Sequence, residues 1–171
     1  NQTDGFILQT GVIRCKCALM NIGDYHIIDR LGIGGSGEIY RAHHKDDAVE
    51  KIVVIKRLLA KLRSDALARD QFLTEADLGR RLMHPNLIRQ LAFGLEDEEL
   101  FLVLQYVDGP NLFTLLNTLR ARSMQPAGYV AGYIISQVLE GLHFAHELKG
   151  ADESYLGLVH RDVNPHNILL S

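Results

Sequence analysis

The strongest constraint on the fold is a change of pattern at Asp108-Gly109-Pro110, past the middle of the chain. Before this tripeptide, short β-branched and apolar runs alternate with glycine and acidic turns, which is typical of strands. After it, apolar residues recur every three or four positions, which predicts helices. A chain built this way places a sheet beside a group of helices. The change therefore predicts an α+β fold of two lobes with a cleft between them.

The segment before the change predicts a small antiparallel sheet and one helix. Candidate strands are 25–32, 37–44 and 52–58, followed by 87–94 and 99–107 around an acidic turn. Between these two groups, Ser64 offers an N-cap for a helix that continues to 82. The apolar positions of this helix include Leu67, Phe72, Ala76 and Leu82.

The segment after the change predicts two helices, over 111–122 and 126–148, with Pro126 near the start of the second. The apolar face of the second helix contains Val130, Ile134, Val138 and Leu142. The chain then divides into an extension, a strand lobe, a connecting hinge and a helical lobe. Their predicted ranges are 1–22, 23–104, 105–110 and 111–171.

Composition limits the partners that this chain can have. The formal net charge of −3 argues against a general nucleic-acid surface, and no apolar run is long enough to span a bilayer. The first residues lack the basic start and apolar core of a signal peptide. Cys15 and Cys17 are the only cysteines, and two thiols alone do not complete a zinc site. We expect two free thiols in a cytoplasmic protein, with a membrane anchor in another segment of the parent protein as the alternative.

A glycine-rich run, GIGGSG at 32–37, is the first candidate for binding chemistry. Glycines at this density let the backbone approach phosphate groups without clashes from Cβ atoms. A flexible hairpin turn is the plain alternative, and a dinucleotide-binding loop requires a strand that runs into a helix. Here a predicted strand follows the glycines, which favours a hairpin lying over a nucleotide.

Lys56 follows a β-branched run and is the candidate cation of a phosphate site. Side chains alternate across a strand, so Val53 and Ile55 facing the core of the lobe put Lys56 and Val54 on the cleft side. A single lysine at a strand end is usually solvated, so it needs a partner. Glu75, at the edge of the apolar face of the predicted helix, is placed to hold the Lys56 ammonium for a phosphate.

The stretch HRDVNPHN, residues 160–167, is the richest in reactive side chains. A carboxylate orients and deprotonates an attacking hydroxyl group, and an amide oxygen binds a hard cation. Asp162 and Asn167 offer one of each, on a short loop that Pro165 stiffens. The pattern predicts a catalytic loop in preference to a polar surface turn.

Together these segments resemble the protein kinase family. GIGGSGEIY, VVIK, FLTEA, HPNL, LFLVLQYVDGPNL and HRDVNPHN occur in the family's order with its kind of spacing. The resemblance covers roughly 25–171. Within the family, the chain is most similar to bacterial serine/threonine kinases of the eukaryotic type. It implies a small antiparallel sheet lobe with one helix, followed by the first part of a helical lobe. The implied activity is ATP- and Mg²⁺-dependent phosphorylation of Ser or Thr in a protein substrate.

The resemblance implies a role for each matching residue. Asp162 is implied as the catalytic base, Asn167 as a Mg²⁺ ligand and Arg161 as the partner of a phosphorylated activation loop. Lys56 is implied to bind the α- and β-phosphates and to pair with Glu75. The loop over the phosphates comprises Gly32, Ile33, Gly34, Gly35, Ser36 and Gly37. The implied adenosine contacts are Leu104 at the back of the pocket, the hinge residues Gln105, Tyr106 and Val107, Asn111 at the ribose, and Ile39, Val54 and Leu169 at the ring.

Several positions depart from the family's pattern. Asn164 stands where serine/threonine kinases often have Lys, and Val54 stands where a small Ala is usual. Gly79 and Gln90 fall where larger apolar residues usually stack inside the small lobe. A D-F-G motif, whose Asp carries the main Mg²⁺ in the family, does not occur in these 171 residues. We therefore expect the chain to be a piece of an active kinase that does not transfer phosphate alone.

Other functions fit the residues less well. A nucleotide-binding pseudokinase or scaffold usually lacks the lysine or the loop aspartate, and both Lys56 and Asp162 are present. A small-molecule phosphotransferase of related fold usually has Gly at the position of Arg161. A Rossmann oxidoreductase conflicts with the strand that follows the glycines.

Overall fold

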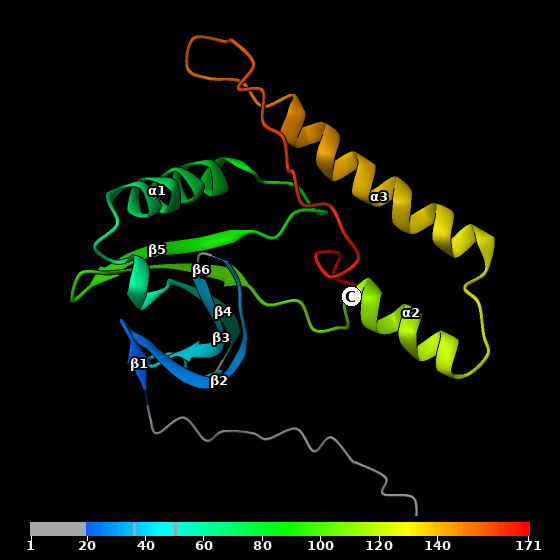
Figure 1. The fold of residues 1–171 in the computed structure, drawn as a ribbon, viewed down its shortest axis with the longest axis horizontal. Coiled ribbons are helices and arrows are strands. Elements are labelled where there is room, and N and C mark those ends of the chain that lie inside the picture. Colours follow the sequence, from blue (N-terminus) through cyan, green and yellow to red (C-terminus); the bar gives the residue numbers. More distant parts are fainter. Residues whose placement is uncertain (1–19, 36, 50) are drawn as a thin grey trace, which may run out of the picture.

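The computed structural model of the protein describes residues 20–35, 37–49 and 51–171, which form a curled antiparallel sheet followed by helices (Figure 1). The strand order is β1-β2-β3-β4-β6-β5. The strands are β1 (Asn21–Ile22), β2 (Tyr25–Ile33), β3 (Gly37–His44), β4 (Ile52–Leu58), β5 (Gln90–Glu96) and β6 (Glu99–Gln105). The helices are the short 3-10 helix η1 (Ala60–Leu62), α1 (Ala66–Arg81), α2 (Leu112–Ala121) and α3 (Gly128–His146).

The strands predicted from the sequence are confirmed, and one more precedes them. β3 and β4 begin and end where their alternating patterns predict. β5 begins at Gln90, three residues later than predicted, because a turn closes before it with a 3.0 Å bond from Leu87 N to His84 O. β1 pairs with the start of β2 and buries Ile22, although its two residues fall in the predicted extension. The cysteines Cys15 and Cys17 lie outside the described residues.

α1 is confirmed, but its beginning differs from the prediction. The N-cap is Asp65, whose carboxylate accepts a 3.1 Å hydrogen bond from the backbone N–H of Ala68, so Ser64 as the cap was wrong. Asp is as good a cap as Ser, and here it is one residue nearer the helix. Phe72 and Ala76 are buried under the helix as predicted. Leu67, on the first turn, is 67% exposed at the edge of a surface groove, so the apolar face begins later than its pattern predicts.

The two faces of the sheet bury separate apolar clusters. Along β3, β4 and β6, every second side chain points into the curl of the sheet, and the side chains between them point toward α1. The cluster inside the curl is Ile22, Ile27, Tyr40, Ala42, Val53, Ile55, Phe101 and Val103. The cluster under α1 is Leu58, Phe72, Ala76, Leu100 and Leu102. Burying a large aliphatic side chain contributes about 1.5–3 kcal/mol, so these clusters stabilise the strand lobe and hold α1 on it.

The helical segment begins after the hinge. Asn111 caps α2 with its side-chain oxygen, 2.8 Å from Thr114 N. α3 begins at Gly128, two residues after Pro126, and its buried Gly141 lies against the segment that follows α1, where a Cβ atom would approach Asn86 O to 3.1 Å. Figure 1 shows the residues after α3 running back between the helices and the sheet to end beside the start of α2. Across the described ranges, no helix has the length and apolar character needed to cross a membrane.

Candidate active site

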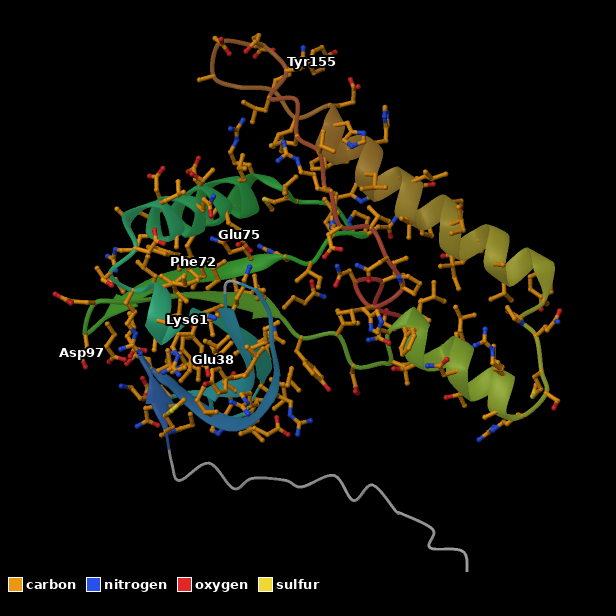
Figure 2. The ribbon with its side chains drawn as sticks, in the orientation of Figure 1. Glu38, Lys61, Phe72, Glu75, Asp97 and Tyr155 are labelled. Atoms are coloured by element: carbon orange, nitrogen blue, oxygen red, sulfur yellow. The ribbon has the colours of Figure 1, made fainter. Side chains whose placement is uncertain are left out.

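Lys56 and Glu75 meet between β4 and α1, on the face of the sheet opposite to the cluster inside the curl. Val53 and Ile55 are 6% and 0% exposed, so the alternation of β4 turns Lys56 to the opposite face. The Lys56 Nζ atom lies 2.6 Å from Oε1 and 2.7 Å from Oε2 of Glu75. Figure 2 shows Glu75 and Phe72 on the side of α1 that faces the sheet. An ammonium has three N–H donors, so two bonds to Glu75 leave one for a phosphate oxygen.

The glycine hairpin lies directly above this lysine. Its turn is closed by a 2.7 Å bond from Gly34 N to Gly37 O, and Ile33 pairs with Glu38 across the hairpin. A Cβ atom at Gly37 would lie 2.9 Å from Arg57 O and 3.2 Å from Lys56 Cγ, so only glycine lets the hairpin approach β4 so closely. Cβ atoms at Gly32 and Gly35 would meet open space, which leaves the tip free to approach a ligand. Ser36 lies outside the described residues.

Three apolar residues predicted to contact adenosine share the face that carries Lys56. Ile39 pairs with Lys56 across β3 and β4, and Val54 pairs with Leu104 across β4 and β6. Directly paired residues point to the same side of a sheet, so these side chains line one continuous surface. The structure therefore places Ile39, Val54 and Leu104 on one surface, and their contact with adenosine stays a prediction.

The hinge after β6 leads from this surface to the helical segment. Gln105 donates its backbone N–H to Arg89 O at 2.9 Å, and Val107 O accepts from Gly109 N at 3.1 Å. Tyr106 and Val107 are half-buried beside the sheet. Beyond the hinge, Asn111 uses its side-chain oxygen as the α2 cap, which leaves its amide N–H groups for the predicted ribose contact.

The predicted catalytic loop holds the Asp162 carboxylate from two sides. Asn164 Nδ2 donates to Oδ1 at 2.6 Å, and Asn167 Nδ2 donates to Oδ2 at 2.8 Å. Because the Asn167 amide directs its nitrogen at Asp162, its oxygen points away as an acceptor for a cation. Arg161 is exposed and has a φ of 62°, a left-handed conformation that costs a non-glycine residue about 1–2 kcal/mol.

Backbone pairing joins this loop to the hinge and to α2. Leu112 N donates to Ile168 O at 2.8 Å, and Leu170 N donates to Pro110 O at 3.0 Å. Leu169 pairs with Asn111, which places it beside the start of α2. The His166 ring also stacks on Phe113 with ring centres 4.0 Å apart. The catalytic loop is therefore fixed to the segment that leaves the hinge.

Sequence reasoning missed three groups that support the site. Asn164 and Gln90 were noted only as departures from the family's pattern, yet Asn164 binds Asp162 directly. Arg57, next to Lys56, connects Glu38 at the hairpin with Glu99 at the start of β6. Gln90 is buried and bonds to α1. The signal for the last two was available, since a charged residue within a β-branched run and a glutamine among apolar residues both require partners when buried.

The same combination of sheet, helix and loop is found in known proteins. The sequence profile described as "Protein kinase domain" matches residues 25–171. Serine/threonine-protein kinase PknJ of Mycobacterium tuberculosis is 35% identical over 147 residues, which are 86% of this chain and 22% of PknJ. Tyrosine-protein kinase MasK of Myxococcus xanthus is 33% identical over 155 residues, 90% of this chain and 24% of MasK.

Solved structures agree with the sequence relatives. The crystal structure of the Mycobacterium tuberculosis PknI kinase domain superposes with a TM-score of 0.67 at 28% identity, covering 90% of this chain and 58% of that domain. This likeness confirms the predicted α+β fold with a sheet lobe and part of a helical lobe. The match of the family profile confirms the resemblance that the motifs carry. The chain belongs to the protein kinase family.

Proposed function

We propose that the protein transfers the γ-phosphate of ATP to serine or threonine side chains of other proteins. The observation that carries this proposal is the arrangement of Asp162, whose two carboxylate oxygens accept amide bonds of 2.6 Å and 2.8 Å from Asn164 and Asn167. These bonds fix the direction of the carboxylate. Each oxygen keeps a second lone pair, so the group remains able to accept the proton of a substrate hydroxyl.

In the proposed reaction, the substrate oxygen attacks the γ-phosphorus while its proton passes to Asp162. The bond between the γ-phosphorus and the bridging oxygen breaks, and ADP leaves. Lys56 holds the α- and β-phosphates, and its pair with Glu75 keeps the ammonium at the cleft. The glycine hairpin covers the phosphates, and the face of Ile39, Val54 and Leu104 contacts the adenine with Leu169 from the other lobe. Arg161 is proposed to bind a phosphorylated loop.

Magnesium is the implied metal of this reaction. When bound, Mg²⁺ neutralises charge on the phosphates, and the outward oxygen of Asn167 is the hard ligand that it prefers. Among the described residues, no group of three His, Cys, Asp or Glu side chains is placed to hold a metal. Mg²⁺ is usually held by one or two carboxylates together with substrate phosphates and waters, and Asn167 supplies an amide oxygen but no carboxylate. We therefore propose that these 171 residues alone do not transfer phosphate.

The amino-acid specificity is a separate part of the proposal. The name of PknJ describes a serine/threonine kinase and that of MasK a tyrosine kinase, at similar identity to this chain. The resemblance of the chain to bacterial serine/threonine kinases supports serine and threonine, whereas Asn164 departs from the Lys that such kinases often have in this loop. The chain spans 22% of PknJ and 24% of MasK, so substrates and regulation of the whole protein belong to the proposal as well.

Phosphoamino-acid analysis tests the proposed function. The full-length gene product is incubated with γ-labelled ATP, Mg²⁺ and a general protein substrate, and the labelled product is hydrolysed to amino acids. We expect labelled phosphoserine and phosphothreonine with the wild type and none with Asp162→Asn. Label mainly on tyrosine contradicts the specificity, and ATP binding without any transfer favours the scaffold alternative.

A further inference from the structure

Gln90, the first residue of β5, is a buried polar side chain that no part of the proposed chemistry uses. It is 9% exposed, and its Nε2 atom donates a 3.0 Å hydrogen bond to the backbone oxygen of Ala76 in α1. A buried amide without a hydrogen-bond partner costs free energy, so the folded state strongly favours this bond. Ala76 directly follows Glu75. The bond therefore holds the helix at the peptide next to the partner of Lys56.

Gly79 makes the space that the Gln90 amide occupies. A Cβ atom at Gly79 would lie 2.3 Å from Gln90 Oε1 and 3.3 Å from its Cδ. Gly79 lies one helical turn after Ala76, so the amide fits between the two residues along one face of α1. A glycine in a helix interior is unfavourable relative to alanine. Here the missing Cβ atom leaves room for the Gln90 amide, which a larger residue would force to shift.

The same glutamine lies at the hinge end of the sheet. Gln90 pairs with Leu104, and the preceding Arg89 accepts the 2.9 Å bond from the hinge nitrogen of Gln105. One side chain thus connects the strand next to the adenine surface with the helix that carries Glu75.

The other contacts of α1 are apolar, open to water, or made by side chains near its ends, such as the exposed 3.1 Å bond from Arg69 to Glu98 O. Phe72 and Ala76 are held by apolar packing, which is non-directional. The Glu75 side chain is 48% exposed, and an ion pair so open to water contributes little on its own. A hydrogen bond to the helix backbone is directional, so it sets both the rotation and the axial position of α1.

We propose that Gln90 is a positioning residue for phosphate transfer: it holds α1 through the Ala76 carbonyl so that Glu75 keeps its ion pair with Lys56, and Gly79 is the residue that admits it. The proposal deepens the proposed kinase function and rests on it. It also explains why a glycine and a glutamine occur together where the family usually stacks apolar side chains.

The test replaces Gln90 with Met in the full-length gene product, because Met has a similar unbranched shape and lacks the amide. Gln125→Met, in the exposed loop between α2 and α3, is the matched control. We expect kcat with γ-labelled ATP to fall about fivefold for Gln90→Met, the size expected from one net hydrogen bond, while KM for the protein substrate stays constant. The control keeps the wild-type kcat.

A double-mutant cycle separates positioning from general stability. In a Glu75→Gln background, Gln90→Met has no further effect on kcat if it acts through Glu75. An undiminished loss in that background, or an unchanged kcat in the single variant, overturns the proposal. Gly79→Ala provides a second route: it raises helix propensity, yet we expect it to lower kcat as Gln90→Met does, and a normal kcat contradicts the packing argument.

Hydrogen exchange keeps the test independent of the proposed function. If Gln90 holds α1, the backbone amide hydrogens of this helix exchange faster in Gln90→Met than in Gln125→Met. Equal exchange rates in the two variants overturn the inference. A wild-type protein that does not transfer phosphate rejects the proposed function and the catalytic role with it. The exchange rates then still decide whether Gln90 holds the helix.

Discussion

At the scale of single residues, Asn164 is half-buried in the catalytic loop and stabilises two parts of it. Its Nδ2 atom is 2.6 Å from Asp162 Oδ1, and its own Oδ1 accepts from His166 N at 2.9 Å. The side chain therefore stabilises both the direction of the proposed base and the turn around it. A lysine at this place makes no such pair of contacts, because it has no acceptor.

Replacing Asn164 by Ala is expected to lower kcat about tenfold, since a bond to a charged group is worth about 1.5–3 kcal/mol and part of it is replaced by water. KM for ATP is expected to stay unchanged, because the phosphates contact other residues. Steady-state kinetics of the full-length gene product measure both constants. Asn117→Ala, on the exposed face of α2, is the control. An unchanged kcat in Asn164→Ala refutes the role of this side chain.

At the scale of elements, the glycine hairpin is anchored by charge at its base. Glu38, next to Gly37, accepts a 2.7 Å bond from Arg57, which also donates to Glu99 at 3.0 Å. The Arg57 and Glu38 side chains are 14% and 17% exposed. The Arg57 hydrogen bond lowers the pKa of Glu38 below its ordinary value of 4.5, against an opposing effect of burial.

This lowered pKa predicts a contribution to acid sensitivity. A carboxyl group whose pKa is lower in the folded state stabilises the fold above pH 4.5, and the contribution is lost as pH falls toward the folded-state pKa. Glu38→Gln is expected to reduce the free energy of unfolding at pH 7 by about 2 kcal/mol. It also loses less stability than the wild type between about pH 5 and pH 3. Denaturant titrations across this range measure both effects.

The matched control for this prediction is Glu140→Gln on the exposed part of α3. Its side chain is exposed, so the substitution removes no contact like that of Glu38 with Arg57. The account of the hairpin base is wrong if Glu38→Gln and Glu140→Gln respond to acid in the same way.

The boundaries of some elements could be predicted from the sequence alone. β3 and β4 were predictable to the residue because one face of each is buried and the other is not, which imposes a period of two. β1 was not predictable, since a strand of two residues is too short to show an alternating pattern. The Asp65 cap was one residue from the predicted Ser64 because both types cap equally well. The contact between Gln90 and Ala76 joins β5 to α1 across 14 residues of sequence, and no local sequence pattern predicts such a contact.

At the scale of the whole molecule, the two lobes meet at the hinge and the chain segment beside it. The pairing of Asn111 with Leu169 and the bond from Leu170 N to Pro110 O bring the end of the catalytic loop against the hinge. A Cβ atom at Gly109 would lie 1.8 Å from Leu170 O. Because this atom belongs to the backbone, the clash is relieved only by moving the segment away.

Gly109→Ala is therefore expected to weaken ATP binding about tenfold, the effect of an overpacked contact that displaces Leu169 from the adenine surface. Calorimetric titration of the full-length gene product with ATP and Mg²⁺ gives the Kd. Gly128→Ala, where a Cβ atom meets open space at the start of α3, leaves the Kd unchanged. Equal affinities for both variants would show that this contact does not position the pocket.

The motifs were enough to predict the family and the separation of the site into two halves. They were not enough to show how each half is held, because Asn164, Arg57 and Gln90 act through contacts that depend on the folded chain. The central claim is that Asp162 acts as the base of a phosphate transfer whose nucleotide is bound by other residues.

The most direct test measures binding and transfer on the same two proteins. The full-length wild type and its Asp162→Asn variant are titrated with ATP and Mg²⁺, and then supplied with γ-labelled ATP and a protein substrate. We expect the same Kd for ATP in both proteins and phosphate transfer by the wild type alone. Transfer by Asp162→Asn at the wild-type rate contradicts this expectation.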